Sequence, residues 1–576
     1  MFLFSPRSRL LLFITLLLSM PVWAAGDAEL IRQQQREQQW QSQHLPEIDV
    51  YLDDLDTPVT SSTLPLHESP CAVIRQIQVS GVDVDFFRLL LPKLIKQTGF
   101  QPEMCLGGKG IQILQTAAQN LLIEAGFVTS QAVIAPQDLA SGSLTIEIQA
   151  GYLAKIDFPG NSRFNPLAKP FPSQSGAILN LRDVEQGLEN LRRLPTVSAD
   201  LNIQAAEQEN ASDIVVNWQQ DFPLRLQIGA DDSGSRTTGK YQGNATLFWD
   251  NPLHLSDLLY VSYNHDLGHK SSYTDSEGIK TQSGTRGHSL HYSLPFGYWL
   301  LSFNYSRYRY HEATEGYTLN YDYNGSSSNI GIALARVLSR SSSYKTTAAV
   351  KLWQQRTKKY LDDIEIEVQR RQTAGWAIDL NHRMQWRQWN MSGGVAFKRG
   401  TGMANSQKAP EEYNDDNDVI SGTSRMKIIN AHLYLSAPFN IGTQRFSFDS
   451  SWQAQWNKTP LTPPDKFSIG GRYTVRGFNG DNSLIGERGW FVQNNLNQYF
   501  LPTHQLYLGL DFGHVAGISA QHRPSQQLTG AVLGIKGTHK LGGIFSYDLF
   551  AGKPLSQPKN FQVAKSSYGF SVNYEF

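Results

Sequence analysis

Apolar and polar positions alternate with a period of two through most of the chain after residue 224. The pattern is clear at 224–230, 299–306, 446–456 and 545–551. Alternating segments of about ten residues, separated by turns, are typical of transmembrane β-barrels, because only alternate side chains face lipid. At roughly 22 residues per strand and connection, residues 221–576 hold about sixteen antiparallel strands. A large soluble β-sandwich or propeller is the alternative.

The connections between these segments are unequal in length. Residues 268–287, 311–328 and 399–427 are long and polar, and we expect them to be extracellular loops. Residues 438–442 are short and are expected to form a periplasmic turn. The chain ends with Tyr568, Phe570, Val572, Tyr574 and Phe576 on one face of a strand, which places aromatic residues at a membrane boundary.

A mixed α/β pattern precedes the barrel region and occurs twice, at 71–150 and 151–220. In the first copy, Leu114, Ala118, Leu121 and Leu122 share one helix face, and Gly126 ends the helix. In the second copy, helical spacing ends before Pro195, and short alternating strands follow. Each copy has about 70 to 80 residues, which is enough for a small independent core.

Residues 27–43 are rich in helix formers, contain seven glutamines and lack a sustained apolar stripe. A helix that is polar all round needs an unusual environment, and a water-filled barrel lumen would provide one. We therefore predict a helix that plugs the lumen; a disordered tail is the alternative. Residues 44–70 contain four prolines and several acidic residues, which predicts an extended linker.

The first 24 residues have the pattern of a secretory signal peptide. Arg7 and Arg9 precede the apolar stretch 10–18, which is too short to span a bilayer, and Ala24 offers a small residue at the cleavage position. An uncleaved anchor is the alternative. Beyond residue 25, no stretch approaches the roughly 20 apolar residues of a membrane helix.

The two cysteines, Cys71 and Cys105, would meet an oxidising compartment in an exported chain. We expect a disulfide between them, which would close a loop of about 35 residues and contribute roughly 3 kcal/mol. Two buried free thiols are the alternative. No metal-ligand spacing is present, so no metal site is predicted.

The composition also limits the classes of function. Lysine and arginine together number 51, equal to aspartate and glutamate, so nothing favours nucleic-acid binding. No nucleotide motif and no nucleophile–base arrangement can be identified, and we predict a non-enzymatic protein without a cofactor.

One carboxylate is predicted to face the inside of the barrel. Leu506, Leu508, Leu510 and Phe512 alternate as a lipid-facing set, so Asp511 must face the lumen, with Gly509 and Gly513 beside it. A carboxylate in a confined interior requires a cationic partner.

Arg476 is the candidate partner. It lies in a glycine-rich segment, 470–478, which is followed by a long connection to Gly489. A bidentate pair between arginine and aspartate could hold such a loop inside the barrel. From these residues alone, a solvated arginine on a surface loop remains the alternative.

The segments Val475-Arg476-Gly477-Phe478 and Asp511-Phe512-Gly513 resemble the Omp85 superfamily of outer-membrane barrels. Residues 179–190 resemble the second POTRA domain of its two-partner secretion branch, whose members export haemolysins, adhesins and contact-dependent inhibition toxins. Residues 231–234, 238–243 and 250–253 resemble the first barrel hairpin of that branch. The resemblance covers nearly the whole chain after the signal peptide.

This resemblance implies a plug helix, a linker, two POTRA domains and a 16-stranded barrel. It implies that Arg476 lies at the tip of an inward-folded sixth loop, and that Asp511 is its partner on the barrel wall. Val475, Gly477, Phe478 and Gly513 would support this pair. Phe576 resembles the terminal signal that the barrel-assembly machinery recognises.

We therefore expect a translocator in the outer membrane, in contact with its lipid, with the POTRA domains in the periplasm. Its partner would be a large secreted exoprotein with an N-terminal secretion domain. The expected exoprotein is a contact-dependent inhibition toxin or a haemolysin or adhesin. A barrel-assembly insertase of the same superfamily is the alternative, but such insertases usually carry more POTRA domains. An outer-membrane enzyme would need catalytic groups that the sequence does not reveal.

Overall fold

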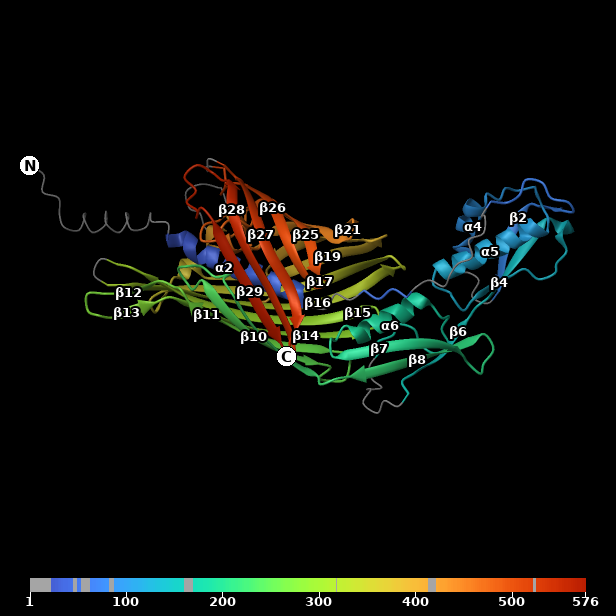
Figure 1. The fold of residues 1–576 in the computed structure, drawn as a ribbon, viewed down its shortest axis with the longest axis horizontal. Coiled ribbons are helices and arrows are strands. Elements are labelled where there is room, and N and C mark those ends of the chain that lie inside the picture. Colours follow the sequence, from blue (N-terminus) through green and yellow to red (C-terminus); the bar gives the residue numbers. More distant parts are fainter. Residues whose placement is uncertain are drawn as a thin grey trace, which may run out of the picture.

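The computed structural model describes residues 22–44, 49–52, 63–81, 87–159, 169–316, 319–412, 421–521 and 525–576. Helix α2 (Val22–His44) is followed by two small α/β domains and a large barrel (Figure 1). Residues 1–21 of the predicted signal peptide lie outside the described residues. Among the residues described, no helix is both long enough and apolar enough to cross a bilayer.

The first α/β domain contains helices α4 (Leu91–Thr98) and α5 (Gly108–Glu124) beside a three-stranded sheet of order β2-β5-β4. Buried side chains from both helices and the sheet, including Leu114, Leu122 and Ile146, form its core. Gly126 has a φ of +94° directly after the second helix, which is why glycine ends that helix. The elements are β1 (Ala72–Ile74), β2 (Gln76–Gly81), α4 (Leu91–Thr98), β3 (Met104–Leu106), α5 (Gly108–Glu124), β4 (Gln131–Val133), η1 (Leu139–Ser141) and β5 (Ser143–Gln149).

A disulfide joins Cys71 and Cys105 in this domain, with their Cα atoms 5.4 Å apart. Strands β1 and β3 pair beside it, with Val73 opposite Cys105. The disulfide therefore fixes the start of the domain to the strand that precedes α5.

Within its described residues, the second α/β domain has one helix and a sheet of order β6-β8-β7. Its elements are β6 (Tyr152–Asp157), α6 (Leu181–Arg192), β7 (Val197–Ala205) and β8 (Ala211–Gln220). Asn180 caps α6 by accepting the N–H of Arg182. The core of this domain continues into the barrel, because Phe248, Leu258 and Tyr260 of the barrel pack with it.

Polar contacts also join the second domain to the barrel. Arg193 donates to the Ser256 carbonyl at 3.0 Å and to the Ser293 hydroxyl at 2.6 Å. Burial lowers the pKa of Arg193 to about 10, although Asp257 and Asp250 oppose that shift. The domain is thus held close to the periplasmic end of the barrel.

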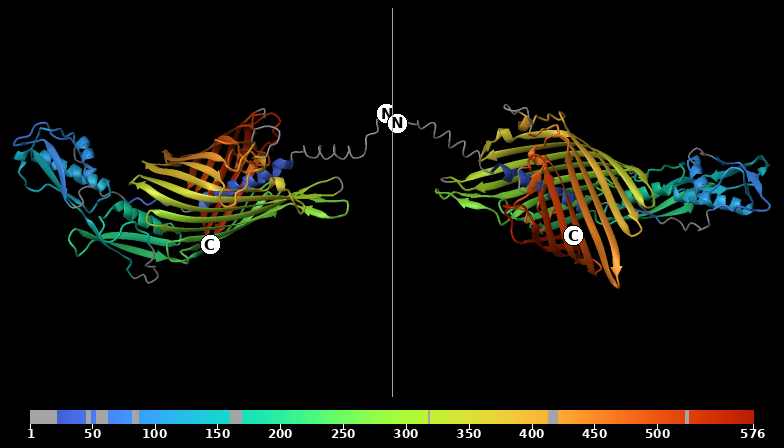
Figure 2. Two further views of the ribbon diagram at one scale, coloured as in Figure 1. Left: turned by 180° about the vertical axis from the view of Figure 1, so that it is seen from behind. Right: turned by 90° about the horizontal axis from the view of Figure 1, so that it is seen from above.

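Sixteen long antiparallel strands and the short β18 (Ile364–Glu365) close the barrel within the described residues (Figures 1 and 2). In order around the ring they are β9 (Leu224–Asp231), β10 (Tyr241–Asp250), β11 (Leu258–Gly268), β14 (Gly284–Phe296), β15 (Trp299–Thr314), β16 (Tyr321–Arg340), β17 (Tyr344–Leu361), β19 (Arg371–Trp386), β20 (Trp389–Thr401), β21 (Lys427–Ile441), β22 (Gln444–Asn457), β25 (Arg488–Leu501), β26 (His504–Ala516), β27 (Gln527–Lys540), β28 (Ile544–Ser556) and β29 (Ser567–Glu575).

The predicted period-two pattern matches the wall of this barrel. On β26, Leu506, Leu508 and Leu510 are exposed on the outside, whereas Tyr507 and Asp511, at the alternate positions, are buried. The exposed set is the lipid-facing surface that the alternation predicted. The prediction of about sixteen strands is confirmed.

Three connections differ from the sequence-based expectation. The segment 311–328 was expected to be a long loop, but β15 continues to Thr314 and β16 begins at Tyr321, so paired strands occupy most of it. The segment 268–287 was expected to be a loop, but it contains the hairpin β12 (Ser272–Thr274) and β13 (Lys280–Gln282), and β14 already begins at Gly284. The expected turn at 438–442 lies later, because β21 continues to Ile441 and Gly442 turns with a φ of +59°. Pairing with neighbouring strands extends these segments beyond what local composition indicates.

Candidate functional site

The connection between β22 and β25 folds into the barrel and carries Arg476. It contains η4 (Pro463–Asp465) and the small hairpin β23 (Phe467–Ile469) and β24 (Leu484–Gly486). We call residues 458–487 the inner loop. The tip of the inner loop contacts β26, β27 and β28 of the wall.

Arg476 and Asp511 form a bidentate ion pair. The Arg476 Nε and Nη2 atoms each lie 2.7 Å from a different carboxylate oxygen of Asp511. The main-chain N–H of Arg476 donates to the same carboxylate at 2.9 Å, and Nη2 also donates to Asn495 on β25 at 2.8 Å. One residue of the inner loop is therefore bound to two adjacent wall strands.

The pair is largely shielded from water. The side chain of Asp511 is 1% exposed and that of Arg476 is 11% exposed. In a site with so little solvent, each charge is stabilised by the other, because removal of either one leaves its partner buried and unpaired.

Glycines on the wall create the space for the loop tip. A Cβ atom at Gly530 would lie 1.8 Å from the Arg476 carbonyl oxygen, and one at Gly552 would lie 2.8 Å from the Gly477 Cα atom. Gly477 itself has a φ of +99°, which other residues rarely adopt. The close approach of loop and wall thus requires glycine on both sides.

An apolar cluster surrounds the pair on the loop side. Val475 is fully buried and Phe478 is 3% exposed, and both pack with Ile469, Leu484 and Leu528. A Cβ atom at Gly513 would lie 2.7 Å from Val475, so this glycine also makes room for the loop.

A second arginine of the inner loop, Arg472, was not singled out from the sequence. It donates to Asp232 at 2.9 Å and to the Phe570 carbonyl at 3.2 Å. Asp232 directly follows β9, and Phe570 lies in β29, so Arg472 reaches the seam where the first and last barrel strands pair. That partnership joins residues far apart in the chain, and no local sequence signal reveals it.

Helix α2 lies inside the ring of strands in all three views of the ribbon (Figures 1 and 2). Its Glu29 is 2% exposed, pairs with Arg32, and accepts hydrogen bonds from Tyr308 at 2.6 Å and Thr238 at 3.1 Å. Arg36 donates to Gln242 at 3.0 Å. The polar faces of the helix are therefore matched by polar side chains of the inner wall.

The helix also touches the inner loop. Arg32 donates to the Gly480 carbonyl at 2.7 Å, and Gln35 donates to the Ser468 carbonyl at 3.2 Å. Helix, inner loop and wall are thus linked by hydrogen bonds in one assembly within the lumen.

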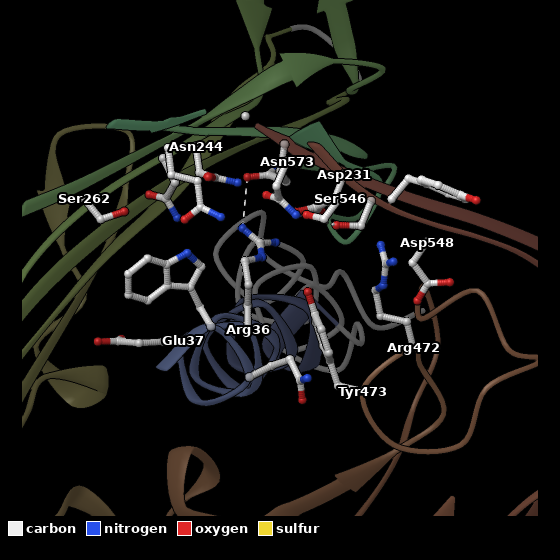
Figure 3. Close-up of a pocket in the computed structure, with 18 of the residues that line it drawn as sticks. Arg36, Glu37, Asp231, Asn244, Ser262, Arg472, Tyr473, Ser546, Asp548 and Asn573 are labelled. Carbon is white, nitrogen blue, oxygen red and sulfur yellow. Dashed lines mark hydrogen bonds between the residues drawn. The ribbon is translucent and has the colours of Figure 1, made fainter. Parts of the chain in front are cut away.

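A cavity of about 760 Å³ remains between the helix, the inner loop and the wall (Figure 3). Arg36 and Glu37 of α2, Arg472 of the inner loop, and Asp548 of β28 border it. Most of the wall side chains that line it are polar, among them Gln227, Asn244, Ser262, Asn495 and Asn573. With helix and loop in place, the lumen is obstructed yet polar.

The remaining candidate residues lie far from this assembly. Cys71 and Cys105 belong to the first α/β domain. Phe576 follows β29 and is 63% exposed, and its N–H donates to the Leu226 carbonyl on β9 at 2.9 Å.

A family model described as haemolysin secretion/activation protein ShlB/FhaC/HecB matches residues 210–537. Two POTRA models match residues 152–205 and 74–151, the latter of the ShlB type. The chain belongs to the ShlB/FhaC/HecB family. As a member of this family it is a two-partner secretion protein of the Omp85 superfamily, located in the outer membrane with two POTRA domains in the periplasm.

Relatives within this family cover most of the chain. The outer membrane transporter CdiB-2 of Burkholderia pseudomallei (strain 1026b) is 30% identical over 477 residues, which is 82% of this chain and 79% of that protein. The hemolysin transporter protein ShlB of Serratia marcescens is 23% identical, with 76% of each chain covered.

Solved structures agree with the fold described above. CdiB from Acinetobacter baumannii has a TM-score of 0.82 and 30% identity, covering 96% of this chain and 99% of that one. CdiB from Escherichia coli has a TM-score of 0.79 and 26% identity, covering 96% of this chain and 99% of that one.

Sequence reasoning found the charged pair and the supporting residues Val475, Gly477, Phe478 and Gly513, but not the wall residues opposite them. Asn495, Gly530 and Gly552 were missed, although Gly530 and Gly534 recur at a spacing of four on β27. Such small residues on alternate positions could have indicated a wall that accommodates a second segment. Their register against Arg476 depends on strand pairing that one sequence does not provide.

Proposed function

We propose that the chain exports one large partner exoprotein, of the contact-dependent inhibition type, by two-partner secretion. The observation that carries this proposal is the likeness to CdiB structures over 96% of the chain, at 30% identity in the first case. The family membership supports secretion in general, and the CdiB relatives favour a toxin as cargo.

We infer that the lumen becomes the conduit once α2 leaves it. The polar cavity beside the helix supports this inference, because an extended polypeptide needs polar partners for its main chain. No ATP is available in the periplasm. The energy for export would therefore come from the exoprotein itself, through folding outside the cell.

We propose that the POTRA domains capture the exoprotein before it enters the barrel. Each POTRA sheet has edge strands, β2 and β4 in the first and β6 and β7 in the second. An edge strand can bind an extended segment through main-chain hydrogen bonds, and this mode suits a substrate that arrives unfolded.

The pair of Arg476 and Asp511 would hold the inner loop in a transport-competent position. Its bidentate geometry and low exposure support this role, since such a pair resists displacement by water. Val475, Gly477, Phe478 and Gly513 would shape the contact around it.

The protein acts by transport rather than by catalysis. Outer-membrane lipid covers the exposed apolar face of the barrel, and the barrel-assembly machinery inserts it after recognising the terminal Phe576.

Deletion of the gene tests the proposal. The partner exoprotein should disappear from the cell surface and medium, and return when this chain is supplied on a plasmid. Unchanged secretion in the deletion strain would contradict the proposal. A general loss of outer-membrane barrels would instead indicate a barrel-assembly insertase.

A further inference from the structure

Residues 49–52 of the linker are enclosed between the second POTRA domain and the barrel. Val50 is 5% exposed and belongs to the same core cluster as Val184 and Leu188 of α6, with Leu52 packed beside it. The barrel side of this cleft is formed by Arg340 and Lys345, on either side of the turn between β16 and β17. We call this site the linker cleft.

Charged side chains in the linker cleft hold the main chain of the peptide. Arg340 donates to the Val50 carbonyl, and the Leu52 N–H donates to Glu185 at 2.9 Å. Arg340 is itself fixed by Glu185 at 3.2 Å and by Glu189 at 2.8 Å. Main-chain groups are common to all peptides, so this recognition does not depend on the linker's own sequence.

Asp49 contributes a contact that does depend on sequence. Its carboxylate pairs with Lys345, and Arg383 of β19 lies 3.4 Å from it. Four cationic side chains lie in the cleft: Arg182, Arg340, Lys345 and Arg383. The POTRA and barrel residues of the cleft provide two anionic side chains, Glu185 and Glu189. Asp49 therefore reduces the excess of positive charge among these groups from two to one.

Movement of α2 out of the lumen along the barrel axis would pull on the linker peptide in the cleft. The part of α2 that follows the predicted signal peptide, residues 25–44, makes a helix about 30 Å long. The segment from His44 to Asp49 can span at most about 18 Å, since each residue extends by no more than about 3.6 Å. Withdrawal of the helix by its own length exceeds the reach of this segment, which favours release of the peptide from the cleft.

We propose that the linker cleft is a peptide-binding site for the exported partner, and that residues 49–52 occupy it at rest. The ligand is an extended segment in which an acidic residue precedes an aliphatic one, with a second aliphatic residue two positions later. The cleft lies where the second POTRA domain meets the barrel, so a bound segment would be delivered to the lumen. This inference rests on the proposed secretion function.

Binding of a fluorescent peptide to the purified full-length protein in detergent tests the cleft. The probe has the sequence of residues 46–55, and a matched probe has asparagine in place of the Asp49 equivalent. Val50→Asp places a carboxylate among the apolar side chains of the core, such as Val184 and Leu188, and should expel the linker peptide. Leu66→Asp introduces the same change at an exposed linker position and serves as control, since Leu66 is 80% exposed.

The acidic probe should bind the Val50→Asp protein roughly tenfold more tightly than it binds the wild type or Leu66→Asp. On the Val50→Asp protein, the acidic probe should also bind roughly tenfold more tightly than the asparagine probe. Adding Lys345→Gln to Val50→Asp should remove the preference between the probes. Equal binding of both probes, or no gain over the wild type, would overturn the proposal.

A secretion assay distinguishes failure of the linker-cleft proposal from failure of the proposed secretion function. Lys345→Gln alone should lower secretion of the partner several-fold while the barrel remains heat-modifiable, and wild-type secretion by this variant would show that the partner does not use the cleft. If the wild-type protein secretes no partner at all, the proposed function fails whatever the probes show.

Discussion

Asp511 illustrates how one residue can bind two parts of a barrel together. Its carboxylate accepts the Arg476 guanidinium and the main-chain N–H of Arg476, so the loop is held by side chain and backbone together. The alternation of β26 was enough to place Asp511 in the lumen, because that pattern is local. The partner on the inner loop followed from the resemblance, because no local pattern specifies it.

Loss of either charge should impair secretion while the barrel stays folded. Removal of one partner from a buried pair typically costs about 3–5 kcal/mol, and here the cost should fall mainly on the inner loop. Arg476→Ala and Asp511→Ala should each strongly reduce export. The double variant should lose less than the two single losses combined, because both remove one interaction.

The measurement is secretion of the partner, compared with heat-modifiability of the barrel in each variant. Wild-type export by Arg476→Ala would contradict the proposed role of the pair. An unfolded barrel would show that the pair acts in assembly instead.

Addition of a methyl group at Gly530, where the wall contacts the inner loop, should also reduce export, without any change in charge. Gly530→Ala would place its Cβ 1.8 Å from the Arg476 carbonyl, so the inner loop would have to move. Gly331→Ala on β16 is a matched control, because the nearest atom to its Cβ, the Leu352 carbonyl oxygen, lies 3.9 Å away. Export should fall in the first variant only; equal export by both would mean that the loop position is not critical.

At the scale of elements, the helices and most of the barrel strands could be predicted from periodicity, whereas their ends could not. The strand β21 runs through Pro438 to Ile441, beyond the turn that composition indicated. Proline is tolerated near strand ends, and pairing with β22 extends the ladder past it. The contacts of α6 with Arg340 and Lys345 were also beyond sequence analysis, since they join residues about 150 positions apart.

Helix α2 should be released more often when its buried carboxylate is removed. Glu29→Ala deletes the acceptor of Tyr308 and Thr238 and the partner of Arg32, which should weaken helix docking by about 1–3 kcal/mol. In planar bilayers this variant should open roughly tenfold more often. Gln38→Ala, on the exposed side of the same helix, should behave as the wild type. Identical opening of the two variants would argue against a plug.

The last strand should be required for assembly rather than for transport. Phe576 is 63% exposed beside the seam of β9 and β29, so its removal costs little packing. Its deletion should nevertheless lower the amount of heat-modifiable barrel in the outer membrane. Phe222→Ala, a change at another exposed phenylalanine, serves as control. Normal barrel levels after deletion of Phe576 would remove the proposed signal.

At the scale of the whole molecule, α2, the inner loop and the second POTRA domain are connected in series. The helix donates to the inner loop through Arg32, and the linker peptide that follows the helix is held by α6 and the barrel. A substrate bound at the POTRA domains could therefore influence the plug through direct contacts. The order of zones along the chain was predictable, but this connectivity emerges only from the folded structure.

Transport by the purified protein tests the central claim most directly. The full-length protein is reconstituted into liposomes with its POTRA domains outward, and an unfolded N-terminal fragment of the exoprotein is added without nucleotide. The account predicts that the fragment becomes protected from added protease inside the vesicles, and that Arg476→Ala abolishes this protection. A fragment that remains fully digestible with the wild-type protein would contradict the proposal that this barrel is the export conduit.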